Sequence, residues 1–305
     1  MLPVSINFCS PSTGPLPLIY IMNEKRVCLL TGASGGLGQS ILWHLIEAGY
    51  CVVATDVKVS TVRRTVKELA DALGESVKDR VRPLALDVRS SAAWSTVWKS
   101  SERYFGPIDI LINNAGVLEP AYTVDLVPES IDRQIDVNTK GTLYGMSVAA
   151  RSMKERRSGH IINVASLAGI SPVPGMSVYS ASKFAVRSAS LAAARELRQY
   201  GVSVSVVCPD GIHTPMLDGA KHMDEAALIF SGAALLRADD VARLIVHDVL
   251  KSRPVEVHIP KLRGWLAKIG SAFPALHGWL APMLVRAGLA RQQKFRASEK
   301  TSGDV

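Results

Sequence analysis

Seven short apolar runs alternate with six longer segments of helical pattern between residues 25 and 260. Each run is rich in β-branched residues and apolar on both faces, as expected of parallel strands covered by helices on each side. The runs are Arg26–Leu30, Cys51–Asp56, Val81–Asp87, Ile108–Asn113, His160–Ala165, Val202–Val207 and Val255–Ile259, and the helical segments are 37–48, 60–74, 91–104, 129–156, 177–199 and 238–251. This alternation predicts an α/β fold with a doubly wound, seven-stranded parallel sheet.

Two segments lie outside the alternation. Residues 1–22 are rich in Pro and Ser, lack the features of a secretory signal and are predicted to be disordered, with Met22 as a candidate start of translation. Residues 261–305 form a basic, amphipathic C-terminal extension whose apolar-aromatic segments are expected to break at Pro274 and Pro282. We therefore expect a single folded domain over residues 23–260.

The positive charge of the chain is concentrated near its C-terminus. From residue 251 onward there are ten Lys and Arg against three acidic residues, so seven of the eight net positive charges lie there. The main domain is nearly neutral, and we predict no nucleic-acid partner.

The four cysteines, Cys9, Cys28, Cys51 and Cys208, are widely separated, and three stand in apolar runs. They are interpreted as buried thiols of a reducing compartment, with neither a disulfide framework nor a metal site. No run of 18 uninterrupted apolar residues predicts a membrane span. The expected location is the cytoplasm, with peripheral membrane contact as an option.

A glycine-rich loop, TGASGGLG, follows the first predicted strand at residues 31–38 and precedes an amphipathic helix. Glycines in this place permit a tight turn, close approach to a pyrophosphate and packing of the helix on the sheet. The alternative is a purely structural turn, but the position of the loop between the first strand and a helix favours dinucleotide binding. The predicted cofactor-binding residues of the loop are Gly32, Ser34, Gly36, Leu37 and Gly38.

Asp56 ends the second strand, about twenty residues beyond the glycines. A carboxylate here can accept both adenosine-ribose hydroxyls and repels a 2′-phosphate, and the glycine loop contains no Arg or Lys. NAD is therefore favoured over NADP, although Lys58 lies nearby. Asp56 alone could also be a solvated loop residue.

The next two strand ends supply further candidates. Asp87 and Val88 are placed to contact the adenine, or else to lead into a helix capped by Ser90 or Ser91. The segment Asn113–Gly116 contains the small Ala115 and Gly116, which would let the backbone lie against the adenosine half, and Asn114 is included in this cofactor-binding set. Asn138 stands among apolar neighbours and is either a core hydrogen-bonding residue or part of a proton relay.

The stretch SLAGISPVPGMSVYSASK places Ser166 thirteen residues before a Tyr179-x-x-x-Lys183 pair. A hydroxyl and a phenol directed at one oxygen can stabilise and protonate, or deprotonate, an alcohol or carbonyl. Lys183, one helical turn beyond Tyr179, lies on the same face, and its positive charge lowers the phenol pKa. By itself Tyr-x-x-x-Lys is a weak pattern.

Together, TGASGGLG, Asp87, the NNAG segment, Asn138, Ser166, YSASK and residues 209–215 resemble the short-chain dehydrogenase/reductase family in its classical branch. The resemblance covers residues 25–260 and implies a Rossmann-type fold. It implies that Tyr179 is the catalytic acid/base, that Ser166 orients the substrate oxygen, and that Lys183 binds the nicotinamide ribose. Asn138 would hold a water linking Lys183 to solvent.

One segment departs from the family pattern. Where Pro-Gly is usual after the sixth strand, this chain has Pro209-Asp210-Gly211, followed by Ile212, His213 and Thr214. The resemblance still implies cofactor contacts for Pro209, Ile212 and Thr214, with Thr214 near the nicotinamide carboxamide. His213 is interpreted as a loop residue because Tyr179 already supplies the base.

The substrate is inferred from apolar loops. The segment after Ser166 and residues 215–236 suit a lipophilic secondary alcohol or ketone, such as a steroid, retinoid or aromatic alcohol, unless these side chains merely pack against the domain. In the extension, Lys and Arg residues are interleaved with Trp265, Ile269, Phe273, Leu276, Trp279, Leu280 and Leu284. That pattern predicts a face that covers the active-site mouth or a subunit interface, with contact to an anionic membrane as the alternative.

We therefore predict an NAD(H)-dependent alcohol dehydrogenase or carbonyl reductase of lipid or steroid metabolism, with a homodimer or homotetramer implied by the resemblance. The alternatives are an NADPH-dependent 3-oxoacyl thioester reductase, which Asp56 argues against, and a non-catalytic dinucleotide sensor. A nucleotide-sugar epimerase would usually have a longer chain.

Overall fold

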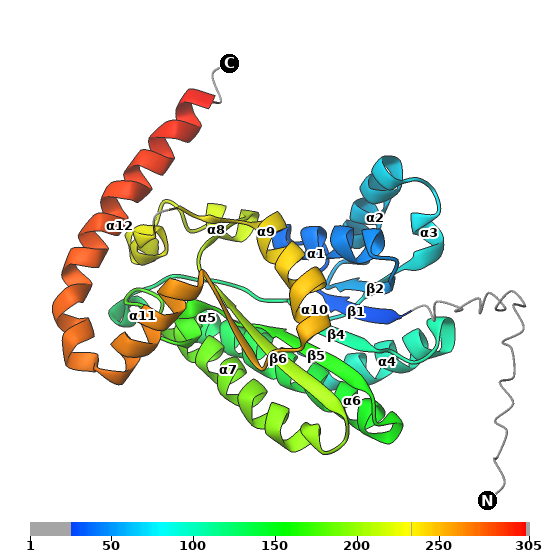
Figure 1. The fold of residues 1–305 in the computed structure, drawn as a ribbon. Coiled ribbons are helices and arrows are strands. Elements are labelled where there is room, and N and C mark those ends of the chain that lie inside the picture. Colours follow the sequence, from blue (N-terminus) through cyan, green and yellow to red (C-terminus); the bar gives the residue numbers. More distant parts are fainter. Residues whose placement is uncertain (1–25, 233, 303–305) are drawn as a thin grey trace, which may run out of the picture.

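Seven parallel strands form one sheet in the order β3-β2-β1-β4-β5-β6-β9 (Figure 1). The computed structural model describes residues 26–232 and 234–302. The strands are β1 Val27–Thr31, β2 Cys51–Asp56, β3 Val81–Ala85, β4 Ile110–Asn113, β5 Gly159–Val164, β6 Val202–Pro209 and β9 Glu256–Ile259. The predicted α/β fold with a doubly wound, seven-stranded sheet is confirmed. Chain order reverses between β1 and β4, and ligands of such sheets bind at this switch point.

Helices connect the strands in the predicted places. They are α1 Gly36–Glu47, α2 Val59–Leu73, α3 Val77–Arg80, α4 Ser91–Phe105, α5 Pro128–Gln134, α6 Gly141–Arg156, α7 Ser177–Arg198, α8 Pro215–Asp218, α9 Ala238–Arg243, α10 Leu250–Ser252, α11 Lys261–Ala272 and α12 Pro274–Ser302. Shorter elements are the 3₁₀ turns η1 Thr123–Asp125, η3 Leu167–Gly169 and η4 Asp224–Ser231, the π-helical turns η2 Ile135–Lys140 and η5 Leu244–Val249, and the two-residue pair β7 Ile212–His213 and β8 Leu236–Arg237.

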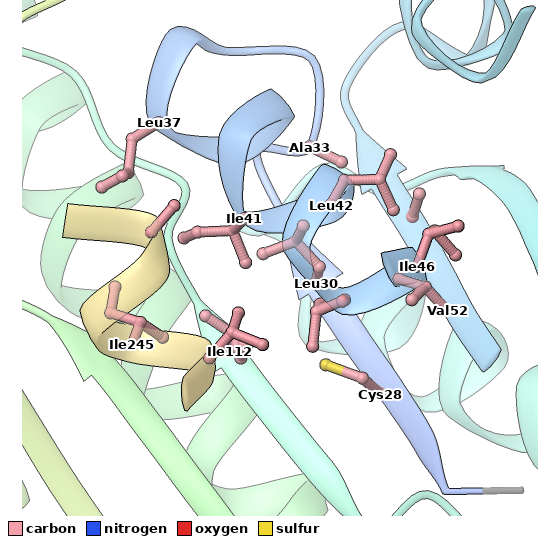
Figure 2. Close-up of a cluster of buried hydrophobic side chains, with 14 of the residues drawn as sticks. Cys28, Leu30, Ala33, Leu37, Ile41, Leu42, Ile46, Val52, Ile112 and Ile245 are labelled. Atoms are coloured by element: carbon pink, nitrogen blue, oxygen red, sulfur yellow. The ribbon is translucent and has the colours of Figure 1, made fainter. Parts of the chain in front are cut away.

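The central strands of the sheet are buried on both faces because they are mainly apolar, whereas the edge strands β3 and β9 are only partly buried. In β1, Cys28 and Leu30 point to one helical layer while Val27 and Leu29 point to the other. The first layer contains α1, α2 and the helix from α9 to α10, and the second contains α4, α6 and α7. Figure 2 shows side chains of α1 gathered over the sheet in the first layer. Both layers fix the strand ends that carry the candidate site.

The C-terminal extension folds into α11 and α12 beside the main body (Figure 1). Pro274 begins α12, where its missing N–H would be unpaired in any case. The prediction of a break at Pro282 is wrong, because α12 continues through it. Proline there lacks only one of the many backbone donors of a 29-residue helix.

Cys28, Cys51 and Cys208 are buried thiols, as predicted. Cys9 and the predicted disordered segment 1–22 lie outside the described residues. Among the described helices none is long and apolar enough to cross a membrane.

Candidate active site

The glycine-rich loop leads from β1 directly into α1. Gly32 adopts φ +65°, a left-handed conformation that favours glycine. Gly35 stands at the N-cap without a side-chain hydrogen bond, and the first turn contains no acidic residue. The free N–H groups at the start of α1 and the helix dipole therefore form an anion site.

Two glycines of this loop leave no room for a side chain. A Cβ on Gly38 would lie 1.9 Å from the carbonyl oxygen of Gly32, so the loop packs on itself there. A Cβ on Gly36 would lie 2.9 Å from Cγ2 of Thr214, which brings the loop after β6 against the glycine loop. These contacts keep both loops close to the switch point of the sheet.

The segment after β4 is held against the glycine loop by hydrogen bonds. The backbone N–H groups of Asn114 and Ala115 each donate to Oγ1 of Thr31 at 3.0 Å. The Asn114 amide donates to the carbonyl oxygens of Thr31 and Gly32, both at 3.1 Å. Asn114 therefore positions the segment after β4, and the small residues Ala115 and Gly116 add no large side chain to it.

Asp56 ties the end of β2 to the glycine loop. Its Oδ2 accepts hydrogen bonds from Oγ of Ser34 at 2.5 Å and from the Ser34 backbone N–H at 3.3 Å. Oδ1 accepts from the Val57 N–H at 2.7 Å. Ser34 thus orients the carboxylate, whereas Asp56 itself borders the cavity described below.

Asp87 and Val88 lie at the end of β3, beside the same cavity. Arg89 forms an ion pair with Asp87 at 2.7 Å, and this hydrogen-bonded pair lowers the pKa of the Asp87 carboxyl. Ser90 caps α4 by accepting from the Ala93 N–H at 3.2 Å. The segment therefore leads into α4 through the Ser90 cap and borders the cavity through Asp87 and Val88, while their contact with the adenine stays a prediction.

Ser166, Tyr179 and Lys183 come together at the ends of β5 and the start of α7. The Tyr179 and Ser166 side chains share a hydrogen bond. Nζ of Lys183 lies 5.7 Å from the centroid of the Tyr179 ring and donates to the Val164 carbonyl oxygen at 3.0 Å. All three residues line the cavity.

Burial is the largest influence on the pKa values of Tyr179 and Lys183. It raises the pKa of Tyr179 to about 12, and the hydrogen bond from Ser166 acts in the opposite direction. Lys183 is only 5% exposed, and its burial lowers the pKa of the ammonium group to about 8. A neutral phenol therefore stands beside a lysine that can exchange its proton close to neutral pH.

Asn138 lies behind the cavity wall, in the π-helical turn η2. Its Oδ1 accepts from the Val117 N–H at 2.8 Å, and its Nδ2 donates to the Val117 carbonyl at 2.9 Å and to Oγ of Ser182 at 3.0 Å. A Cβ on Gly116 would lie 3.2 Å from Oδ1 of Asn138 and 3.5 Å from Nζ of Lys183. The turn thus places Asn138 directly behind Gly116, on the Lys183 side.

One cavity of about 1120 Å³ connects these parts. It is bordered by most of the sequence-predicted residues: Gly32, Gly36, Leu37, Gly38, Asp56, Asp87, Val88, Asn114, Ala115, Gly116, Ser166, Tyr179, Lys183, Pro209, Ile212 and Thr214. Ser34 and Asn138 support its wall from behind. His213 is exposed, lies outside the lining, and packs edge-on to Phe295 at 5.4 Å.

The unusual Asp210 has a structural partner. Its carboxylate pairs with Nη1 of Arg263 from α11 at 3.0 Å, although burial raises the pKa of Asp210. A Cβ on Gly211 would lie 2.4 Å from Cγ2 of Ile229, so the shifted glycine permits close packing of η4. The departure from the family pattern therefore joins this loop to the C-terminal extension.

Sequence reasoning missed several residues of the cavity wall. They are Val57, Arg89, Arg133, Arg263, Leu266, Gly270 and Arg291. The last four belong to the extension, and Ile269 and Leu284, which the sequence pattern places on its apolar face, line the cavity beside them. The prediction that this segment covers the mouth of the site agrees with that position. In the apolar segment 215–236, Leu228 and Ile229 line the cavity. Phe230 of the same segment is buried in the interior.

No group of three or more His, Cys, Asp or Glu side chains suited to a metal ion occurs within residues 26–232 and 234–302.

The sequence profile described as "short chain dehydrogenase" matches residues 26–225. The chain belongs to the short-chain dehydrogenase/reductase family. As a family member it is an NAD(P)-dependent oxidoreductase. Oxidoreductase BOA17 of Botryotinia fuckeliana is 29% identical over 278 residues, which are 90% of this chain and 96% of that protein. An uncharacterized oxidoreductase of Staphylococcus epidermidis is 30% identical over 240 residues, 79% of this chain and 97% of that one.

Solved structures of the short-chain dehydrogenase/reductase family share the fold. A family member from Burkholderia phymatum in complex with NAD is 25% identical, has a TM-score of 0.72, and covers 83% of this chain and 95% of its own. An actinorhodin polyketide ketoreductase variant with NADPH is 26% identical, has a TM-score of 0.69, and covers 77% of this chain and 95% of its own. One of these two similar structures therefore contains NAD and the other NADPH.

The residues present fit a dinucleotide. At Gly32, Gly36 and Gly38 a Cβ would collide with neighbouring atoms of the protein, so only glycine permits the tight turn of this loop, and the uncapped start of α1 suits a pyrophosphate. Asp56 would hold the adenosine ribose, and Lys183 the nicotinamide ribose.

Lys183 gives the site a measurable effect on stability. Its pKa is about 8 in the folded chain against an ordinary value of 10.5, so between these pH values the unfolded chain binds more protons. Stability therefore rises with pH across this window. Chemical denaturation from pH 7 to 10.5 should show the free energy of unfolding of wild type rising relative to Lys183→Met by up to roughly 1.4 kcal/mol per pH unit. Parallel profiles would contradict this protonation state.

Proposed function

We propose that this protein is an NAD(H)-dependent oxidoreductase that interconverts a lipophilic secondary alcohol and its ketone. One observation carries the proposal: the hydrogen-bonded Ser166 and Tyr179 border a cavity that also contains Asp56 at the dinucleotide end. A phenol and a hydroxyl that meet at one point suit a single substrate oxygen.

The proposed proton transfer takes place at the hydroxyl of Tyr179. In the oxidative direction its phenolate accepts the proton of the alcohol, while Oγ of Ser166 donates a hydrogen bond to the substrate oxygen. Burial opposes the phenolate, and the positive charge of Lys183 favours it. The cofactor, when bound, supplies the hydride acceptor or donor. In the reductive direction the phenol returns the proton to the carbonyl oxygen.

The substrate end of the cavity supports a lipophilic substrate. Met176, Leu228, Ile229, Leu266 and Ile269 contribute apolar side chains from three separate segments. An apolar wall with few polar groups binds an alcohol by burial of its hydrocarbon part and orients it through the reacting oxygen. The polar pair at Ser166 and Tyr179 would provide that orientation.

Asp56 supports NAD as the cofactor. Its carboxylate faces the cavity, and the nearest cation of the β3 end, Arg89, is already paired with Asp87. A 2′-phosphate would therefore meet the negative charge of Asp56, with the exposed Lys58, past the end of β2, as the remaining nearby cation. The same feature disfavours the alternative of an NADPH-dependent 3-oxoacyl thioester reductase.

Asp56→Asn tests this assignment because it removes the charge and keeps the size. We expect kcat/KM with NAD relative to NADP to fall at least about tenfold, which corresponds to 1.4 kcal/mol. The exposed Asp71→Asn on α2, which pairs only with Lys67 on the surface, is the matched control and should leave the ratio unchanged. A wild-type preference for NADP would reject NAD as the cofactor.

For assembly, we propose a homodimer or homotetramer through α6 and α7. Along α7 the small side chains of Ala181, Ser188 and Ala192 are exposed, which leaves room for a second helix.

A further inference from the structure

Helix α11 is amphipathic in the opposite sense to a surface helix of a soluble domain. Its charged and small residues face the protein body. Arg263 pairs with Asp210 at 3.0 Å, and Lys268 pairs with Glu256 of β9 at 2.7 Å. Gly264 is buried so closely against His258 that a Cβ there would lie 2.2 Å from Cβ of His258.

The outward face of α11 is apolar. Leu262, Trp265, Leu266, Ile269 and Phe273 follow helical spacing and fall within an arc of about 100°. Each is between 48% and 72% exposed, and Met283 of α12 is 63% exposed. Five of these side chains share one face of α11 and its end, and Met283 lies on the next helix; exposed apolar side chains gathered in this way mark an interaction surface. We call these six residues the α11 face.

The extension is firmly attached to the body, so the α11 face is part of the fold. Gln292 is 1% exposed and donates to the carbonyl oxygens of Lys221 and Met223 at 3.0 and 2.9 Å. Arg263 also donates to Oγ of Ser231 at 3.0 Å. Figure 1 shows α11 and α12 along one side of the molecule, with α12 beside the segment that contains η4.

Exposed positive charge accompanies the α11 face on α11 itself and along α12. Lys261, Arg286 and Lys294 are exposed, and none of them forms an ion pair with a carboxylate in the described part of the chain. The whole segment from residue 251 holds ten Lys and Arg against three acidic residues, whereas the rest of the chain is nearly neutral. An occupant of this face must therefore be apolar in its interior and negatively charged at its surface.

The α11 face also borders the cavity. Leu266 and Ile269 belong to both: they are exposed on α11 and line the cavity. Leu284 of α12 also lines it. A lipophilic molecule leaving the apolar phase beneath α11 would reach the cavity without crossing bulk water.

We propose that the α11 face docks the protein on an anionic phospholipid membrane, with the helix lying in the plane of the interface. Aromatic and aliphatic side chains enter the boundary of the acyl chains, and Lys261, Arg286 and Lys294 contact the anionic headgroups. The mouth of the cavity then opens toward the lipid, from which substrate enters. This last point rests on the proposed function; the docking does not.

Vesicle flotation with the full-length protein tests the docking without any turnover. Vesicles contain phosphatidylcholine alone or phosphatidylcholine mixed with phosphatidylserine. The test variant is Leu262→Ser/Trp265→Ser/Phe273→Ser, which spares the two residues that line the cavity. The matched control replaces three exposed side chains elsewhere: Tyr104→Ser/Val124→Ser/Val127→Ser.

The wild-type chain and the control should float with the anionic vesicles, with much weaker binding to phosphatidylcholine alone and at high salt. The test variant should bind at least about tenfold more weakly, because it lacks three apolar side chains that the membrane would remove from water. Absence of wild-type binding would overturn the proposal. It would also be overturned if light scattering showed that the test variant turns a wild-type oligomer into monomers, since the α11 face would then contact a second copy.

Discussion

Tyr179→Phe abolishes turnover and leaves cofactor binding intact. The substitution removes only the hydroxyl that shares a hydrogen bond with Ser166. General acid–base catalysis contributes about 10²–10⁴-fold, so kcat falls by at least this factor in both reaction directions. The ring remains, and the wall of the cavity keeps its shape. Steady-state rates of NADH formation and consumption measure the loss.

Two measurements separate a chemical loss from a structural one. Tyr122→Phe removes a hydroxyl from a 43%-exposed tyrosine outside the cavity lining and should retain wild-type kcat. The affinity of Tyr179→Phe for NADH, followed by cofactor fluorescence, should stay within a few-fold of wild type. Activity of Tyr179→Phe near the wild-type rate would remove this residue from the mechanism.

Gly38→Ala destroys the dinucleotide cradle. The new Cβ would lie 1.9 Å from the carbonyl oxygen of Gly32, and the atoms that it meets belong to the backbone, which cannot rotate away as a flexible side chain can. Overpacking of flexible side chains costs about 1–3 kcal/mol, and we expect at least the upper end here, with loss of NADH binding. Thermal unfolding of the cofactor-free protein and fluorescence titration with NADH measure the two effects.

Gly35→Ala is the control within the same loop. Gly35 has an ordinary φ of −77°, and its Cβ would meet the Gly32 carbonyl oxygen at 3.5 Å, a normal contact. The unfolding temperature of this variant should remain close to that of wild type. If Gly38→Ala proves as stable as Gly35→Ala, the tight crossing of the loop is not a requirement of the fold.

The sheet could be predicted because its signal is local and repeated. Each strand of the seven-stranded sheet falls in one of the predicted runs between helical segments, and parallel strands covered on both faces produce that pattern. The candidate site followed from the ends of these strands, since Asp56, Asn114 and Ser166 each come at or just after a strand that terminates at the same edge. The same alternation of strands and helices therefore predicts both the fold and the position of the candidate site.

The extension could not be predicted in the same way. The apolar spacing of Leu262, Trp265 and Ile269 indicates a face but not its direction, and in an ordinary surface helix that face would point inward. Its orientation depends on long-range ion pairs, those of Arg263 with Asp210 and of Lys268 with Glu256. Only the three-dimensional arrangement shows that the polar side was the buried one.

Contacts between residues far apart in the sequence also determine what Asn138 and Ser34 do. Asn138 and Ser34 were predicted from their motifs, but their partners, Val117, Ser182 and Asp56, lie up to 44 positions away in the chain. A sequence pattern identifies such residues as polar and placed near a site. It does not tell whether they face the ligand or support its wall.

The most direct test of the central claim is the appearance of NADH absorbance at about 340 nm when the wild-type protein is mixed with NAD and a series of secondary alcohols of increasing apolar size. We predict cofactor reduction with NAD, at a kcat/KM that rises with the apolar size of the alcohol and is lost in Tyr179→Phe. No change with NAD or NADP across the whole series, and none with NADH or NADPH and the corresponding ketones, would contradict the proposed function and favour a non-catalytic dinucleotide sensor.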